Sequence, residues 1–188
     1  MQIFTSFTPE VIELLKNGAV GVIPTDTVYG VVTPLFNQVG VERMYELKGR
    51  EEAKPVGTVL INDPLQVEHI AQSEHLLRAS AYWPAPVSVV IPVSSELHYA
   101  HKGLDSLPFR VPDHESLQRL LLQTGPLATS SANFAGQMPP TTLQEALGYF
   151  REGVDFYVDG GDLSHRKPSA ILRFNEEGEP ELLRGELK

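Results

Sequence analysis

Segments with strand character alternate with helical segments along most of this sequence, and this alternation strongly limits the possible folds. Strands are predicted at 19–23, 28–32, 55–61, 87–93, 109–111, 127–129, 156–158, 170–174 and 181–183, with helices between most of them. Such a chain is expected to layer helices on a sheet. The first two and the last two strands are joined too tightly for helical crossovers, so the sheet should be mixed. We therefore expect an α/β fold.

The segment 94–106 departs from this alternation. It is polar and shows no helical pattern, so we expect an irregular surface loop. His98 and His101 lie three residues apart within it, and we expect them to be surface residues rather than metal ligands. Further along the chain, Asp113 is expected to cap the next helix.

Length, charge and cysteine content narrow the functional classes. The chain has 188 residues, a net charge of −9 and no cysteine. We find no interdomain linker, so one domain over 1–188 is expected. Disulfides and thiolate zinc sites are excluded, and neither a signal peptide nor a membrane-crossing run is visible, so we expect a cytoplasmic protein. The negative charge opposes non-specific attraction to nucleic acid, so any polyanion site must be a local cluster of cations.

The stretch 24–30 places polar side chains between the first two strands. Pro24 ends the first strand, because proline has no N–H to donate to a sheet. Thr25, Asp26 and Thr27 then bring two hydroxyls and a carboxylate to the sheet edge. Gly30, inside the second strand, is typical of close backbone approach by a ligand or another segment. An ordinary hairpin whose Asp and Thr cap their own backbone explains the same residues, and the stretch alone leaves both interpretations open.

Three cations follow the second predicted helix within seven residues. They are Lys48, Arg50 and Lys54, with Glu51 and Glu52 between them. Arginine grips phosphate oxygens bidentately and lysine supplies a point charge, so the cluster could be a phosphate clamp. A solvated charged loop is the alternative.

A third polar cluster, 129–133, follows a predicted strand. Its hydroxyls and amide could bind a phosphate, a ribose or a base, or could simply form a turn. Arg110 lies between Phe109 and Val111, and a buried arginine needs an anionic partner. Neither a P-loop nor a Rossmann fingerprint is present, and the six histidines form no convincing metal set.

Taken in order, these clusters resemble the YrdC family, the threonylcarbamoyl-adenylate synthases. The matching motifs run from about Gly18 to Gly185. They are Pro24-Thr25-Asp26-Thr27-Val28-Tyr29-Gly30, Lys48-x-Arg50 with Lys54-Pro55, Trp83-Pro84-x-Pro86, Arg110-Val111-Pro112, Ser131-Ala132-Asn133, Pro168-Ser169 and Leu183-Arg184-Gly185. The sequence departs from the family pattern at several positions, such as Ser88, where threonine is usual.

The resemblance implies a three-layer domain with a twisted mixed sheet and a concave basic cavity. It implies ATP, bicarbonate and L-threonine as substrates, and threonylcarbamoyl-adenylate and pyrophosphate as products. Mg²⁺ is expected with ATP, without a dedicated set of protein ligands. A downstream transferase would use the adenylate to modify tRNA, and a contact with RNA is possible.

The resemblance also implies roles for individual residues. The expected catalytic residues are Lys48 and Arg50. Those expected to bind ATP are Arg50, Lys54, Ser106, Ser131, Asn133, Ser169 and Arg184. Those expected to contact threonine are Thr27, Arg110 and Thr129.

Two other functions fit the same motifs. A related domain of hydrogenase-maturation proteins handles carbamoyl-adenylate, although it normally sits within a much longer chain. A non-catalytic RNA-binding module could use the same basic cavity, but the net charge of −9 weighs against it.

Overall fold

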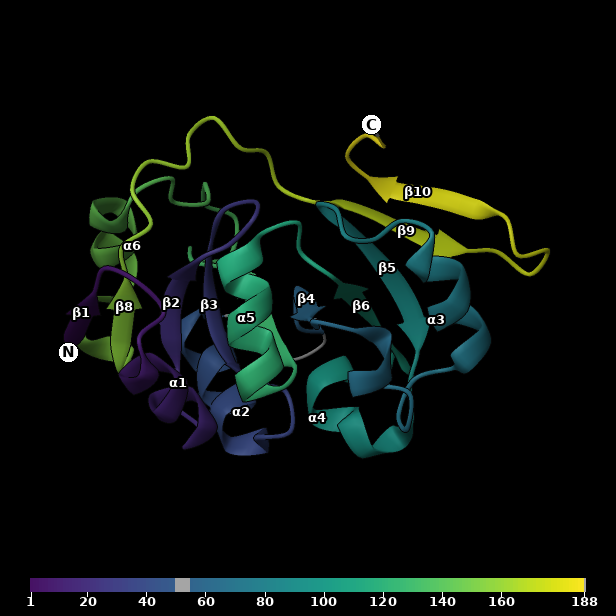
Figure 1. Ribbon diagram of the computed structural model, residues 1–188, viewed down its shortest axis with the longest axis horizontal. Coiled ribbons are helices and arrows are strands. Elements are labelled where there is room, and N and C mark those ends of the chain that lie inside the picture. Colours follow the sequence, from purple (N-terminus) through teal and green to yellow (C-terminus); the bar gives the residue numbers. More distant parts are fainter. Residues whose placement is uncertain (50–54, 188) are drawn as a thin grey trace.

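The structure is a computed structural model that describes residues 1–49 and 55–187. Strands in these ranges form one sheet in the order β1-β8-β2-β3-β7-β4-β6-β5-β9-β10 (Figure 1). Their bounds are β1 Gln2–Phe4, β2 Gly21–Pro24, β3 Tyr29–Pro34, β4 Thr58–Leu60, β5 Val87–Pro92, β6 Ser106–Arg110, β7 Leu127–Ser131, β8 Phe156–Val158, β9 Ala170–Phe174 and β10 Pro180–Arg184.

The sheet is mixed, which confirms the expectation from the short connections. β2 and β3 pair antiparallel, with Gly21 opposite Val32 and Pro24 opposite Tyr29. β9 and β10 also pair antiparallel. Longer connections place β8 parallel to both β1 and β2, β4 parallel to β6, and β5 parallel to β9.

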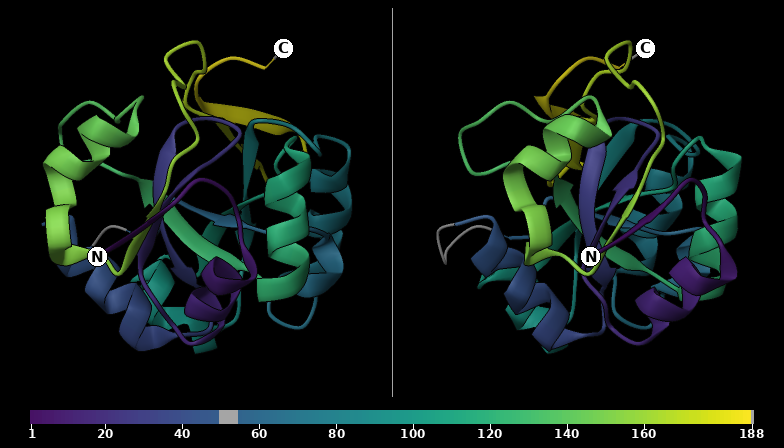
Figure 2. Two further views of the ribbon diagram at one scale, coloured as in Figure 1. Left: turned by 60° about the vertical axis from the view of Figure 1, so that its left-hand side comes forward. Right: turned by 90° about the vertical axis from the view of Figure 1, so that its left-hand side faces the viewer.

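Helices cover both faces of the sheet (Figures 1 and 2). Their bounds are α1 Pro9–Lys16, α2 Gln38–Leu47, α3 Ser73–Ser80, α4 His98–His101, α5 Glu115–Thr124 and α6 Leu143–Phe150, with short 3₁₀ turns η1 Pro64–Gln66, η2 Ser95–Leu97 and η3 Arg151–Gly153. None of these helices is long and apolar enough to span a membrane.

Two buried clusters of apolar side chains hold the layers together. Successive strand residues point to opposite faces, so Ile23 packs with α1 and α5, whereas Val22 packs in the larger cluster that includes α2 and α6. Neighbouring β3 alternates in the same way, with Val32 on the first side and Val31 on the second. The result is a helical layer, a sheet and a second helical layer, so the expected α/β fold is confirmed.

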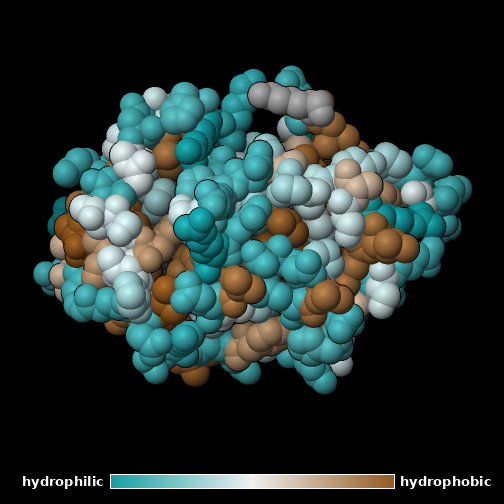
Figure 3. Space-filling view, in the orientation of Figure 1, coloured by the Kyte–Doolittle hydropathy of each residue, from teal (hydrophilic) through white to brown (hydrophobic). Residues whose placement is uncertain are grey.

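Apolar side chains are scattered over the face shown in Figure 3, singly or in small groups. Large exposed apolar residues include Val39, Leu65, Leu77, Leu122 and Met138. Scattered exposure of this kind is normal for a folded protein and does not by itself mark an interface.

The expectation of a loop over 94–106 is wrong. The segment forms η2 and α4, and Leu97, Ala100 and His101 are buried. These three side chains pack against the core, which stabilises helical turns that have little amphipathic pattern. His98 is exposed as expected, but His101 is not a surface residue. In the next helix the cap is His114 rather than Asp113, because its Nδ1 accepts from the backbone N–H of Leu117.

Candidate active site

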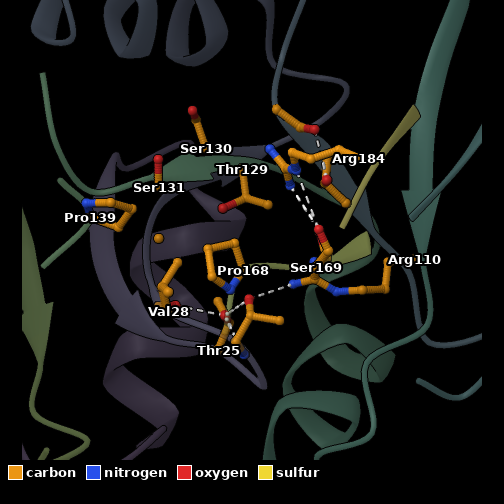
Figure 4. Close-up of a pocket in the computed structure, with 14 residues that line it drawn as sticks. Thr25, Val28, Arg110, Thr129, Ser130, Ser131, Pro139, Pro168, Ser169 and Arg184 are labelled. Carbon is orange, nitrogen blue, oxygen red and sulfur yellow. Dashed lines mark hydrogen bonds between the residues drawn. The ribbon is translucent and has the colours of Figure 1, made fainter. Parts of the chain in front are cut away.

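A cavity of about 260 Å³ opens where the β2–β3 turn meets the ends of β6 and β7 (Figure 4). Hydroxyl groups and two guanidinium groups supply most of its polar lining. The lining residues are Thr25, Thr27, Val28, Gly30, Gly57, Thr58, Arg110, Thr129, Ser130, Ser131, Pro139, Pro168, Ser169 and Arg184. Two of these residues are arginines and none is acidic.

The turn between β2 and β3 is held by its own hydroxyl groups. Thr25 Oγ1 donates to the carbonyl of Val28 at 2.6 Å and accepts from the N–H of Thr27 at 3.1 Å. With its hydrogen committed to Val28, Thr25 Oγ1 is an acceptor for the Thr27 hydroxyl, 3.0 Å away. The two interpretations of this stretch are therefore compatible, since Thr25 caps the turn while both threonines line the cavity.

Arg110 lies at the end of β6 and is buried, as its apolar neighbours predict. Its Nη2 lies 2.9 Å from Oδ1 of Asp26, and the two side chains are only 4% and 2% exposed. The same nitrogen donates to Thr27 Oγ1 at 3.4 Å. The anionic partner expected for a buried arginine is thus Asp26, and the pair joins β6 to the β2–β3 turn.

Arg184, at the end of β10, supplies the second guanidinium group. Its Nη2 donates to the carbonyl and the hydroxyl of Ser169, at 3.0 and 3.3 Å. Partial desolvation lowers the pKa of Arg184, and the positive charge of Arg110 lowers it further. Two cations that repel each other across a partly desolvated cavity would both gain from an anion between them.

Lys48 ends α2 but does not line the cavity. It is 5% exposed, and its Nζ donates to the carbonyls of Ser131 and Asn133, the latter at 2.6 Å. The ammonium group therefore ties the end of α2 to the end of β7. Arg50 and Lys54, the other two members of the expected clamp, lie outside the described residues.

Asn133 does not line the cavity either, and its side chain makes structural contacts instead. Its side-chain N–H groups donate to the carbonyls of Phe134 and Gln137, both at 2.8 Å, so they close the loop after β7. Ser106 is not brought to the site either. It begins β6, at the opposite end from Arg110, and its hydroxyl donates to the carbonyl of Leu104.

Six of the expected site residues do meet at the cavity. They are Thr27, Arg110, Thr129, Ser131, Ser169 and Arg184. Thr129 Oγ1 donates to the carbonyl of Val31 on β3. A Cβ atom at Gly30 would lie 2.6 Å from Thr129 Oγ1, so a larger residue there would displace the Thr129 hydroxyl.

Several lining residues had no functional signal in the sequence. Thr58 and Gly57 belong to a segment whose sequence predicts only a strand. Pro139 belongs to a turn-rich stretch. Thr25 stood out with its neighbours, but nothing distinguished it from a capping residue. Arg166, which donates to the carbonyl of Thr25 at 2.6 Å, holds the segment before β9 against the turn.

No group of three or more His, Asp or Glu side chains able to hold a metal ion occurs in the described ranges.

Comparison with known proteins identifies the family. The model of the Sua5/YciO/YrdC family, described as telomere recombination, matches residues 13–185. A putative threonylcarbamoyl-AMP synthase of Mycobacterium leprae is 33% identical over 90% of this chain and 78% of its own. Threonylcarbamoyl-AMP synthase of Vibrio cholerae is 31% identical over 86% of this chain and 89% of its own.

Among solved structures, Sua5 of Pyrococcus abyssi in complex with L-threonine aligns with 98% of this chain at a TM-score of 0.87 and 27% identity. The chain spans 57% of that protein. The family match over most of the sequence and these relatives agree with the fold and with the order of the motifs. The chain belongs to the Sua5/YciO/YrdC family.

Proposed function

We propose that this chain is a threonylcarbamoyl-AMP synthase, which forms L-threonylcarbamoyladenylate and pyrophosphate from ATP, bicarbonate and L-threonine. The observation that carries the proposal is the pair Arg110 and Arg184 on one hydroxyl-lined cavity, in a chain whose relatives are named for this reaction. The threonine complex of the P. abyssi protein supports threonine as the amino acid.

The chemistry suits such a cavity. The amine of threonine and bicarbonate give a carbamate and water, and a carbamate oxygen then attacks the α-phosphorus of ATP. The bond from that phosphorus to the bridging oxygen breaks, and pyrophosphate leaves with the electron pair. No covalent bond to the protein is needed, so the chain contributes by holding the anions together and stabilising the charge that develops on phosphate oxygens.

The cavity suggests a division of roles. We assign Thr27, Arg110 and Thr129 to threonine and its carbamate, and Ser131, Ser169 and Arg184 to the nucleotide. The resemblance adds Arg50 and Lys54 to the phosphates. Lys48 would act on this site by fixing the carbonyls at the end of β7, a positioning role that replaces direct contact with the substrate. Mg²⁺ would arrive with ATP and be held by its phosphates, as part of the substrate.

The product has a defined use in this proposal. A mixed anhydride of a carbamate and AMP is an activated acyl donor, and a separate transferase would move its threonylcarbamoyl group to an adenosine of tRNA. This chain would make the donor, and any contact with RNA would serve that delivery.

Pyrophosphate release tests the proposal. It should require ATP, bicarbonate and L-threonine together, and release that continues without threonine would overturn the synthase. Serine lacks one methyl group, which a pocket distinguishes by only about 1–3 kcal/mol, so slow turnover of serine is compatible with the proposal. Release that depends on carbamoyl phosphate in place of threonine and bicarbonate would favour the carbamoyl-adenylate function. Salt-sensitive RNA binding without pyrophosphate release would favour the RNA-binding module.

A further inference from the structure

A chain of buried hydroxyl groups runs from Arg184 into the sheet. Arg184 Nη2 donates to Ser169 Oγ at 3.3 Å, and Ser169 Oγ lies 3.2 Å from Ser88 Oγ. Ser88 Oγ lies 3.1 Å from Thr58 Oγ1, which donates to the carbonyl of Gly57 at 2.7 Å. We call this chain, from Arg184 through Ser169 and Ser88 to Thr58, the Ser88 relay. It links β10, the segment before β9, β5 and β4.

The direction of every hydrogen bond in this relay follows from its two ends. A guanidinium group can only donate and a carbonyl oxygen can only accept. Each hydroxyl has one hydrogen, so all four contacts form together only if Ser169 donates to Ser88 and Ser88 donates to Thr58. The hydrogens of all three hydroxyls are then committed within the protein, and Ser169 Oγ keeps a lone pair toward Arg184.

Side-chain packing on β10 does little to fix the position of the Arg184 guanidinium group. All five residues of β10 are exposed, and the pairing of β10 with β9 is irregular between Leu182 and Arg184. The guanidinium group is held over the cavity by the carbonyl and hydroxyl oxygens of Ser169. The orientation of the Ser169 hydroxyl depends in turn on Ser88, which is fully buried and does not line the cavity.

We propose that Ser88 is a positioning residue that orients the anion-binding guanidinium of Arg184 through Ser169. Without the Ser88 hydroxyl, the Ser169 hydrogen loses its acceptor and turns toward another partner, and the lone pair that faces Arg184 turns with it. Arg184 would then bind the anion less well. The proposal rests on the proposed function only for the identity of that anion, since a phosphate-like group of any source would probe the same guanidinium.

The test measures the affinity of the wild-type protein and its variants for inorganic pyrophosphate and for ATP by calorimetry, with thermal unfolding in parallel. Ser88→Ala should weaken binding of both by roughly threefold to tenfold, the effect of one lost hydrogen bond. Ser88→Thr keeps the hydroxyl and should restore binding. Thr33→Val is the matched control, because Thr33 is buried and its hydroxyl has no partner among the described residues, so this change should leave both affinities as they are.

A double variant shows whether Ser88 acts through Arg184. In an Arg184→Ala background, Ser88→Ala should have no further effect on either affinity. A full additional loss in that background, or unchanged binding in folded Ser88→Ala, would overturn the relay. Wild-type protein that binds pyrophosphate but not ATP would count against the proposed function while the relay is still tested by pyrophosphate. Wild-type protein that binds neither anion would overturn both.

Discussion

Nη2 of Arg110 and Oδ1 of Asp26 lie 2.9 Å apart in a pair that is almost completely shielded from solvent. Neither oxygen of Asp26 accepts a well-aligned hydrogen bond from the described residues, so the attraction is chiefly between charges. The pair fixes the β2–β3 turn against β6 at the edge of the cavity. Asp26 also partly neutralises the charge of Arg110. The charge of Arg184 is therefore the less compensated of the two.

Asp26→Ala should lower the free energy of unfolding by about 3–5 kcal/mol, because it leaves the charge of Arg110 buried without a partner. Glu181→Ala is the matched control, since its partner Arg173 is 54% exposed and such pairs contribute at most about 1 kcal/mol. Urea unfolding measures both changes. Equal and small losses in the two variants would show that the Asp26 pair is not the buried contact described above.

Lys48→Ala should destabilise the protein by roughly 1.5–3 kcal/mol, the range for a hydrogen bond to a charged group, because the carbonyls of Ser131 and Asn133 lose their donor. A solvent-exposed clamp lysine would instead leave the melting temperature nearly unchanged. Lys16→Ala, which removes an exposed partner of Glu13, is the control. If Lys48→Ala keeps a normal melting temperature but forms the adenylate much more slowly, Lys48 contacts the substrate directly.

Ser131→Ala and Asn133→Ala should separate binding from stability. Ser131 lines the cavity, so its alanine variant should bind ATP more weakly by about 1 kcal/mol and unfold normally. Asn133 closes the loop through two carbonyls, so its variant should be less stable and more susceptible to proteolysis between 133 and 140. Titration calorimetry and limited proteolysis would distinguish them. If the two variants behave alike, the division of roles is wrong.

His101 should make stability depend on pH. Burial lowers its pKa below the ordinary 6.5, an effect that His98 increases and Asp105 opposes. Its Nδ1 accepts from the N–H groups of Gly103 and Asp105, so the folded protein favours the neutral ring. As the pH falls through 6.5, the unfolded chain takes up the proton first, and stability should decrease until the folded pKa is passed.

His101→Asn tests this dependence, since an amide oxygen can replace Nδ1 as acceptor but does not titrate. The free energy of unfolding of the wild type should fall more than that of the variant between neutral pH and about one unit below 6.5. His69→Asn serves as the control, because His69 is exposed and does not act on His101. Parallel pH profiles for wild type and His101→Asn would contradict the assignment.

The general fold was predictable because its main signals are local. The short links between β2 and β3 and between β9 and β10 require antiparallel pairs, whatever the rest of the chain does. β1 gives no such signal, since it has only three residues and its pairing with β8 depends on a segment far along the chain. α4 depends on tertiary packing of Ala100 and His101, which outweighs the polar composition around them.

The site was predictable in part for the same reason. Burial of Arg110 between apolar residues requires an anion, but only the folded sheet determines that Asp26 supplies it. Lys48 was singled out by its charge, whereas its contacts with two carbonyls depend on how α2 meets β7. The Ser88 relay brings together four distant segments of the chain, and no local pattern marks hydroxyl groups for such contacts.

The most direct test of the proposed synthase is the fate of labelled bicarbonate. The protein would be incubated with ATP, Mg²⁺, L-threonine and ¹³C-bicarbonate. The nucleotide products would then be separated and identified by mass spectrometry. We predict a labelled mixed anhydride of threonine carbamate and AMP. Its amount should equal the pyrophosphate released, and it should be absent when threonine is omitted. Pyrophosphate or AMP formed without a labelled, threonine-containing adenylate would contradict the account.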